Sequence, residues 1–220
     1  MPSNVRILQE GLLAHVTEAT GGPGLGGVAL HVEALAMVGS SATTSVQFGV
    51  CPPGHEVCGV KREHVPGETG GGPGAYEVAT VNVTAMTLDA WAEAHGLLGG
   101  EGAAAARKID VLAVDTEGLD ALVLAGGARL LAARQVRVLL FEYHQFRAWS
   151  TSLLQDVVAN LDNFGMDCYL LQQKLALRLT GSCWHAAFEF RYWSNVMCVL
   201  REEEAMAAAL AGFAEIPIIA

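Results

Sequence analysis

Apolar residues recur at helical spacing at the start of the chain, where Val5, Leu8, Leu12 and Val16 precede a double glycine. This pattern predicts an N-terminal helix. Short apolar runs predict strands over 28–32, 43–48 and 78–84. Thr87 is then the expected N-cap of a short helix over 88–95. The first part of the chain is therefore expected to contain two helices and three strands.

The second part of the chain has a more regular alternation of strand and helix patterns. An apolar run over 109–114 is followed by a helical pattern over 119–133, and a second run over 136–141 by a helical pattern over 152–164. Three more apolar runs predict strands, and a polar helix follows them; these segments are 168–172, 175–180, 195–200 and 202–213. This order predicts an α/β fold whose sheet ends in antiparallel strands.

Two glycine-rich segments interrupt these elements. Residues 21–27 leave a helical pattern and enter a strand, which is the reverse of the order in a dinucleotide-binding turn, so this segment is interpreted as a linker. Residues 49–76 are rich in glycine and proline and predict a long loop. Lys61, Arg62 and His64 could turn this loop toward a substrate, and an insertion without a chemical role is the alternative.

Composition narrows the class of protein. The 220 residues are 52% hydrophobic and 16% charged, which predicts a well-buried globular chain. A net charge of -10, with scattered basic residues, argues against a nucleic-acid partner. No apolar run is long enough to span a bilayer, and no signal peptide is visible. These features favour an intracellular location.

The five cysteines are an odd number at wide spacings, which argues against a disulfide framework and fits a reducing compartment. Cys51, His55, Cys58 and His64 lie close in sequence. Their spacing is wider than that of structural zinc sites, so a polar loop is the preferred interpretation.

The most informative stretch is the end of the strand over 109–114, where Asp115-Thr116-Glu117-Gly118 leads into the next helix. Open α/β sheets bind ligands at the carboxyl ends of their strands, so these acids predict a site. The alternative is that the acids only stabilise a helix N-terminus. Glu142, Tyr143 and His144 end the neighbouring strand and would meet the same edge.

Several segments together resemble the FkbM family of S-adenosylmethionine-dependent methyltransferases. The family pattern includes a T-L-D helix start, an I-D-x-L-K-I-D-x-E-G strand and a V-L-x-G-A helix, in this order. The matching residues are Thr87-Leu88-Asp89, Ile109 to Gly118, Val123 to Ala128, Phe141-Glu142 and Asn195-Val196-Met197. The resemblance covers about 28–200. One departure is Ala113, where the family commonly has lysine.

The resemblance implies a Rossmann-like class I methyltransferase sheet with antiparallel C-terminal strands, in a partial domain over 1–201 followed by a C-terminal helix and tail over 202–220. On this alignment the first two strands, the glycine-rich cofactor turn and a ribose-binding acid lie upstream of Met1, so the chain is expected to be N-terminally truncated. A divergent protein that never had them is the alternative. Truncation would expose a sheet edge and predicts self-association.

The function that the resemblance implies is S-adenosylmethionine-dependent O-methylation of a sugar or a small hydroxylated metabolite, with cofactor binding dependent on the missing part of the site. A non-catalytic fragment or partner-binding remnant is the alternative. Aromatic residues near the strand ends either shape the acceptor pocket or pack under loops; these are Tyr143, Phe146, Trp149, Trp184, Tyr192 and Trp193. The expected site residues are Asp115, Glu117 and His144 for catalysis, Glu33, Ala34 and Asp115 for the cofactor, and Glu142 and Tyr143 for the substrate.

Overall fold

The computed structural model describes residues 36–37, 39–40, 44–49, 80–98, 108–172, 175–206 and 208. The predicted N-terminal helix, the strand over 28–32, the loop after Gly49 and half of the predicted C-terminal helix lie outside these residues. The proposed domain boundary and the truncation therefore stay predictions.

The strands are β1 Ala36–Met37, β2 Ser45–Gly49, β3 Thr80–Met86, β4 Ile109–Val114, β5 Val136–Tyr143, β6 Met166–Leu171, β7 Ala176–Arg178 and β8 Ser194–Leu200. The α-helices are α2 Leu88–Ala94, α3 Asp120–Ala125, α4 Ala128–Ala132 and α5 Leu154–Asn163, and the 3-10 turns are η2 Arg147–Ser150, η3 Gly181–Cys183 and η4 Ala186–Glu189.

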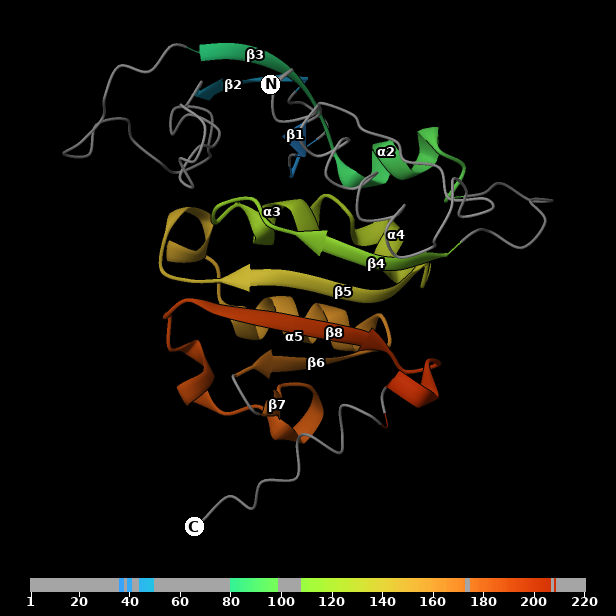
Figure 1. The fold of residues 1–220 in the computed structure, drawn as a ribbon, viewed down its shortest axis with the longest axis vertical. Coiled ribbons are helices and arrows are strands. Elements are labelled where there is room, and N and C mark those ends of the chain that lie inside the picture. Colours follow the sequence, from blue (N-terminus) through green and yellow to red (C-terminus); the bar gives the residue numbers. More distant parts are fainter. Residues whose placement is uncertain are drawn as a thin grey trace, which may run out of the picture.

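A five-stranded mixed sheet forms the larger layer, in the order β4-β5-β8-β6-β7 (Figure 1). β4 and β5 are parallel, whereas β8 runs antiparallel to both of its neighbours, β5 and β6. β7 is antiparallel to β6. The mixed α/β sheet with antiparallel C-terminal strands is thus confirmed. Because β8 is reversed, its first residues lie at the same edge of the sheet as the last residues of β4 and β5.

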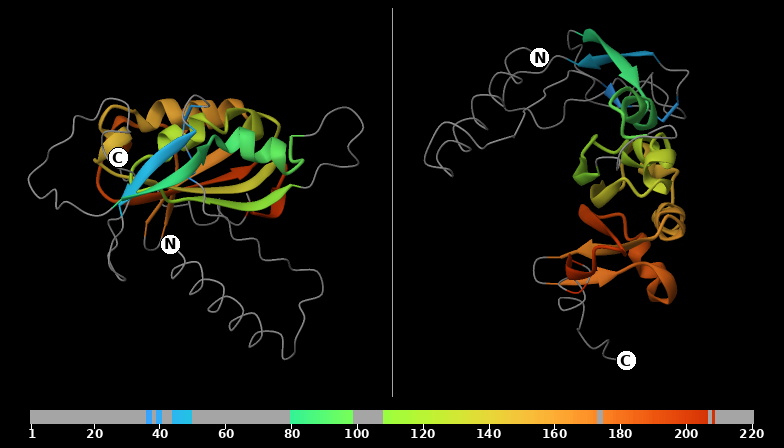
Figure 2. Two further views of the ribbon diagram at one scale, coloured as in Figure 1. Left: turned by 90° about the horizontal axis from the view of Figure 1, so that it is seen from above. Right: turned by 90° about the vertical axis from the view of Figure 1, so that its right-hand side faces the viewer.

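Helices α3, α4 and α5 lie on one face of this sheet (Figure 2). The main core fills the space between them, and β5 contributes Leu139, Phe141 and Tyr143 to it. The intervening side chains of β5 face the other side, where Val138 belongs to a second cluster with Tyr169. The sheet is therefore packed by helices on one side, and its alternate residues are free to form a site on the other.

A small sheet of order β1-β3-β2 lies at the top of the molecule in Figure 1. β2 pairs antiparallel with β3, and its buried Val46 packs in one cluster with Val83, Leu119 and Ala148. Leu119 follows the acidic turn after β4, and Ala148 belongs to η2. The small sheet thus supports the two turns that leave the carboxyl ends of β4 and β5.

The single predicted helix over 119–133 is wrong in one respect, because it breaks into α3 and α4 at Gly126-Gly127. Leu88 packs closely on this glycine pair, since a Cβ on Gly127 would lie 2.7 Å from its Cδ2 atom. Asp89 then caps the new helix start by accepting hydrogen bonds from the backbone N–H groups of Arg129 and Leu130. Thr87 caps α2 as predicted. The Thr-Leu-Asp segment therefore caps both α2 and α4 and holds the two helices together.

The prediction against disulfides is also wrong at one pair. Cys168 of β6 and Cys198 of β8 face each other across the sheet, with Cα atoms 4.0 Å apart, and form a disulfide. Their separation of 30 residues hid the pairing in the sequence. Cys183 is a free, exposed thiol. Within the part of the chain that the structure describes, no helix is long and apolar enough to cross a membrane.

Candidate active site

The acidic turn after β4 has an unusual backbone. Glu117 has a φ of 55° and Gly118 a φ of 91°, so both lie in the left-handed region. Gly118 also packs tightly, because a Cβ there would lie 2.7 Å from Cε1 of His144 and 2.9 Å from the carbonyl oxygen of Phe146. Glycine is therefore required by conformation and by space, and the turn after β4 touches the turn after β5.

The buried side chain of Asp120 links the turn after β4 to the end of β5. Its side chain is fully buried. One carboxyl oxygen accepts hydrogen bonds from Thr116 Oγ1 and the Gly118 N–H, both at 3.2 Å, and the other accepts from the Glu142 N–H at 3.3 Å. Burial raises the pKa of Asp120 to about 6 against these hydrogen bonds, which lower it. Asp120 thus has a structural role, since its hydrogen bonds join the turn after β4 to the end of β5.

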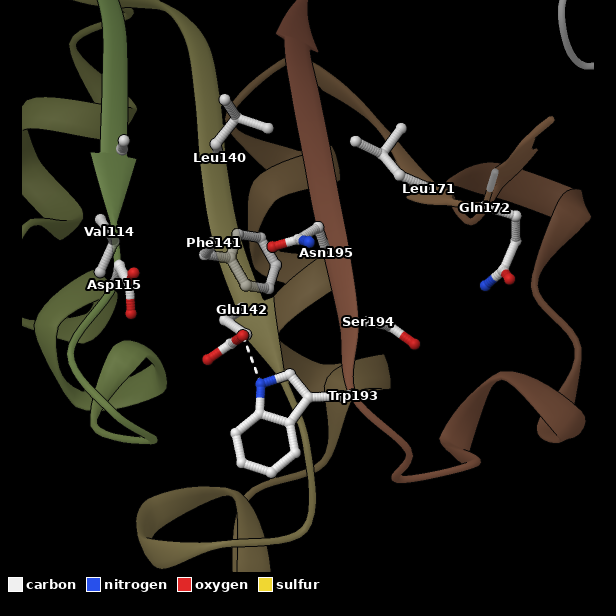
Figure 3. Close-up of a pocket in the computed structure, with 11 residues that line it drawn as sticks. Val114, Asp115, Leu140, Phe141, Glu142, Leu171, Gln172, Trp193, Ser194 and Asn195 are labelled. Carbon is white, nitrogen blue, oxygen red and sulfur yellow. Dashed lines mark hydrogen bonds between the residues drawn. The ribbon is translucent and has the colours of Figure 1, made fainter. Parts of the chain in front are cut away.

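Asp115 and Glu142 follow or end adjacent parallel strands, β4 and β5, and point toward the same space (Figure 3). Asp115 is exposed, whereas Glu142 is partly buried. Burial raises the pKa of Glu142, the indole N–H of Trp193 lowers it by donating a hydrogen bond, and the charge of Asp115 raises it. The negative charges of the two carboxylates therefore repel each other across the strand ends.

His144 lies beneath this pair, with 1% of its surface exposed. Its Nδ1 atom accepts a hydrogen bond from the Phe146 N–H at 3.1 Å, so the neutral ring carries its proton on Nε2. Nε2 lies 3.7 Å from Oε2 of Glu142 and has no hydrogen-bond partner. Burial lowers the pKa of His144, more than the charge of Asp115 raises it. At neutral pH the ring is an uncharged donor that faces Glu142.

These strand ends open into a cleft of about 650 Å³. Figure 3 shows Asp115 on one side, Glu142 and Trp193 in the middle, and Leu171 and Gln172 on the other side. The cleft lies at the carboxyl edge of β4, β5 and β6, which is where open α/β sheets bind ligands. Its lining consists of Ala113, Val114, Asp115, Leu140, Phe141, Glu142, Leu171, Gln172, Trp193, Ser194 and Asn195.

The structure brings only some of the predicted site residues together. Asp115 and Glu142 line the cleft, while Glu117 and His144 lie in the turns that border it without lining it. Tyr143 points to the opposite face, where it is fully buried and donates a hydrogen bond to Glu189 at 2.8 Å. Burial and Glu189 raise the pKa of Tyr143 to about 12. Glu33 and Ala34 lie outside the described residues.

Sequence reasoning missed the contribution of β8. Trp193, Ser194 and Asn195 enter the cleft because β8 is antiparallel and starts at the carboxyl edge of its neighbours. The aromatic and polar residues immediately before the apolar run over 196–200 are the signal that could have revealed this. The sequence allows Trp193 either to line the pocket or to pack under a loop. In the structure it lines the cleft, and its ring also stacks on His144 with a centroid distance of 4.7 Å.

Comparison of the sequence with known protein families identifies one matching family. The model of the methyltransferase FkbM domain matches residues 54–168, just over half of the chain. The match includes β4, β5 and both of the turns described above, and it ends within β6. No curated protein and no solved structure matches the chain. Among the described residues, no group of three or more histidine, cysteine or acidic side chains is arranged to hold a metal ion.

Proposed function

Because this chain belongs to the FkbM methyltransferase family, we propose that it transfers a methyl group from S-adenosylmethionine to a hydroxyl oxygen of a sugar or another small hydroxylated metabolite. The observation that supports this most strongly is the convergence of Asp115 and Glu142 in one cleft at the carboxyl edge of β4 and β5. A transferase of this kind needs two reactants held side by side, and much of its rate enhancement comes from that placement.

The donor set of the cleft fits the chemistry of the cofactor. S-adenosylmethionine supplies a methyl group on a positively charged sulfur, and carboxylates stabilise a positive charge placed beside them. We assign this role to Asp115, which is exposed at the end of β4. Glu33 and Ala34 remain our proposed contacts for the adenosine part.

The proposed reaction forms a bond between the acceptor oxygen and the methyl carbon while the carbon–sulfur bond breaks. The bonding electron pair goes to sulfur, and the acceptor loses its hydroxyl proton. Glu142 is our proposed proton acceptor, because a carboxylate with a raised pKa is a stronger base than an ordinary one. A base within hydrogen-bond reach of the hydroxyl fulfils the geometric requirement of general base catalysis.

The other predicted residues take supporting roles in this proposal. His144 faces Glu142 with a protonated Nε2, so we assign it to positioning Glu142 instead of to accepting the proton itself. Glu117 forms part of the strained turn that carries Asp115. Strained backbone of this kind concentrates at functional sites. Tyr143 supports the core behind Glu142 through its hydrogen bond to Glu189.

The test measures cofactor binding by calorimetry and transfer of a labelled methyl group to a panel of methyl glycosides. Asp115→Asn should weaken cofactor binding or slow transfer at least about tenfold, because it removes a charge beside the sulfonium. Asp110→Asn is the matched control, since Asp110 lies on β4 and its exposed side chain pairs with the exposed Arg137. Cofactor binding without transfer to any glycoside of the panel would contradict the proposed acceptor, and no cofactor binding at all would favour the non-catalytic fragment or partner-binding remnant.

A further inference from the structure

The charged residues in the described lining of the cleft are all acidic. Asp115 and Glu142 are the acidic members of its described lining, and the other lining residues are apolar or neutral. Arg147 lowers the pKa of His144 through its charge, but it does not line the cleft. An anionic ligand would therefore meet two carboxylates without a basic lining residue among those described.

An aromatic surface lies beside these carboxylates. The Trp193 ring stacks on His144 and lies 5.5 Å from the Phe146 ring, and 53% of Trp193 remains exposed. Its indole N–H donates to Glu142, which fixes the ring at the floor of the cleft (Figure 3). An exposed indole face held next to a carboxylate binds the apolar face of a sugar ring and attracts a cation.

His144 lies next to the cleft and leaves a polar atom unsatisfied. Its buried Nε2 has no hydrogen-bond partner and lies 3.7 Å from Oε2 of Glu142, too far for a good hydrogen bond. Buried polar atoms in folded proteins rarely lack a partner. A shift of Glu142 that shortens this contact would satisfy the Nε2 atom, and Glu142 would then remain held at the edge of the cleft.

We propose that the acceptor site is selective for charge: it prefers a sugar ring that carries an amino group, accepts a neutral ring, and rejects a ring that carries a carboxylate or a phosphate. The ring stacks on Trp193, and its amino or hydroxyl groups contact Glu142, whereas Asp115 faces the cofactor. This inference rests on the proposed function, because it names the acceptor class of the same cleft.

Three methyl glycosides test this order, because methyl glucosaminide and methyl glucuronide each differ from methyl glucoside at a single substituent. Their dissociation constants for the full chain, measured by ligand-observed NMR, should rise in that order, with the glucuronide at least about tenfold weaker than the glucosaminide. The difference should shrink at high salt, because dissolved ions screen exposed charges. Trp193→Ala should weaken all three ligands.

A pair of lysine variants on β4 provides a sharper control. Ala113 lines the cleft, whereas Val111 lies two residues earlier on the same face, is 57% exposed and does not line it. Ala113→Lys should tighten the glucuronide and weaken the glucosaminide, while Val111→Lys should leave the order unchanged. The inference is overturned if the glucuronide binds as tightly as the glucosaminide, if no glycoside binds, or if the two lysine variants behave alike.

Methyl transfer to the same three glycosides separates this inference from the proposed function. Transfer that is as fast to the glucuronide as to the glucosaminide would support the methyltransferase and overturn the charge preference. Binding in the expected order without any transfer would support the charge preference and overturn the methyltransferase.

Discussion

Asp120 shows how a single buried acid links the stability of the site to pH. Because burial raises its pKa from 3.8 to about 6, the folded protein holds this proton more tightly than the unfolded chain. Asp120 therefore stabilises the fold most below about pH 4, and this contribution is lost as the pH rises toward 6. We expect its loss to reach about 3 kcal/mol of unfolding free energy.

Urea denaturation between pH 4 and pH 7 measures this contribution, with Asp120→Asn as the variant. The variant should be about as stable as wild type at pH 4, because its amide resembles the protonated carboxyl of Asp120, and its stability should fall less as the pH rises. Asp156→Asn is the control, since Asp156 is an exposed acid on α5. Parallel pH curves for wild type and Asp120→Asn would contradict the prediction.

The alternation of residues along β5 explains which site residues could be predicted. Glu142 reaches the cleft because it ends a strand beside Asp115, which the strand order implies. Tyr143 follows directly and so points to the other face, into the core. The sequence places both at the strand end, but the face that each one occupies depends on where the helices pack.

At the scale of elements, the turn after β4 depends on one glycine. Gly118→Ala introduces a Cβ into a left-handed backbone and places it 2.7 Å from His144. We expect a loss of about 1–2 kcal/mol from the conformation, and a further loss from the clash. Thermal denaturation measures the total effect, and cofactor binding should weaken with it because Asp115 moves with the turn.

Gly96→Ala separates these two contributions. Gly96 also has a positive φ, but nothing lies within 4 Å of its hypothetical Cβ. The control should therefore show the conformational loss alone. Equal destabilisation by the two substitutions would show that the contact between Gly118 and His144 has no energetic weight.

The elements that could be predicted from the sequence are those whose boundaries are local. β4 begins and ends where its apolar run does, and Thr87 caps α2 as expected. The break between α3 and α4 has a local signal in Gly126-Gly127, which the predicted helix over 119–133 passed over. The close packing of Leu88 on Gly127 comes from 39 residues away in the chain and could not be predicted.

At the scale of the whole molecule, the cleft depends on β8, which enters the sheet between β5 and β6. The two predicted acids come from adjacent parallel strands, whose order the α/β pattern implies. Trp193 and Asn195 join them only because the last strand is reversed and inserted. A sequence pattern predicts that such a strand exists, but its position in the sheet is decided by long-range pairing.

The Cys168–Cys198 disulfide ties β8 to β6 and so connects one wall of the cleft to the sheet. It closes a loop with a sequence separation of 30, for which the loss of chain entropy on cross-linking predicts a stabilisation of about 3–4 kcal/mol. Peptide mapping without reductant should find the two cysteines cross-linked, and Cys168→Ala with Cys198→Ala should lower the urea midpoint. Cys183→Ala removes an exposed free thiol and should leave the midpoint unchanged. Recovery of both Cys168 and Cys198 as free thiols from the non-reduced protein would refute this pairing.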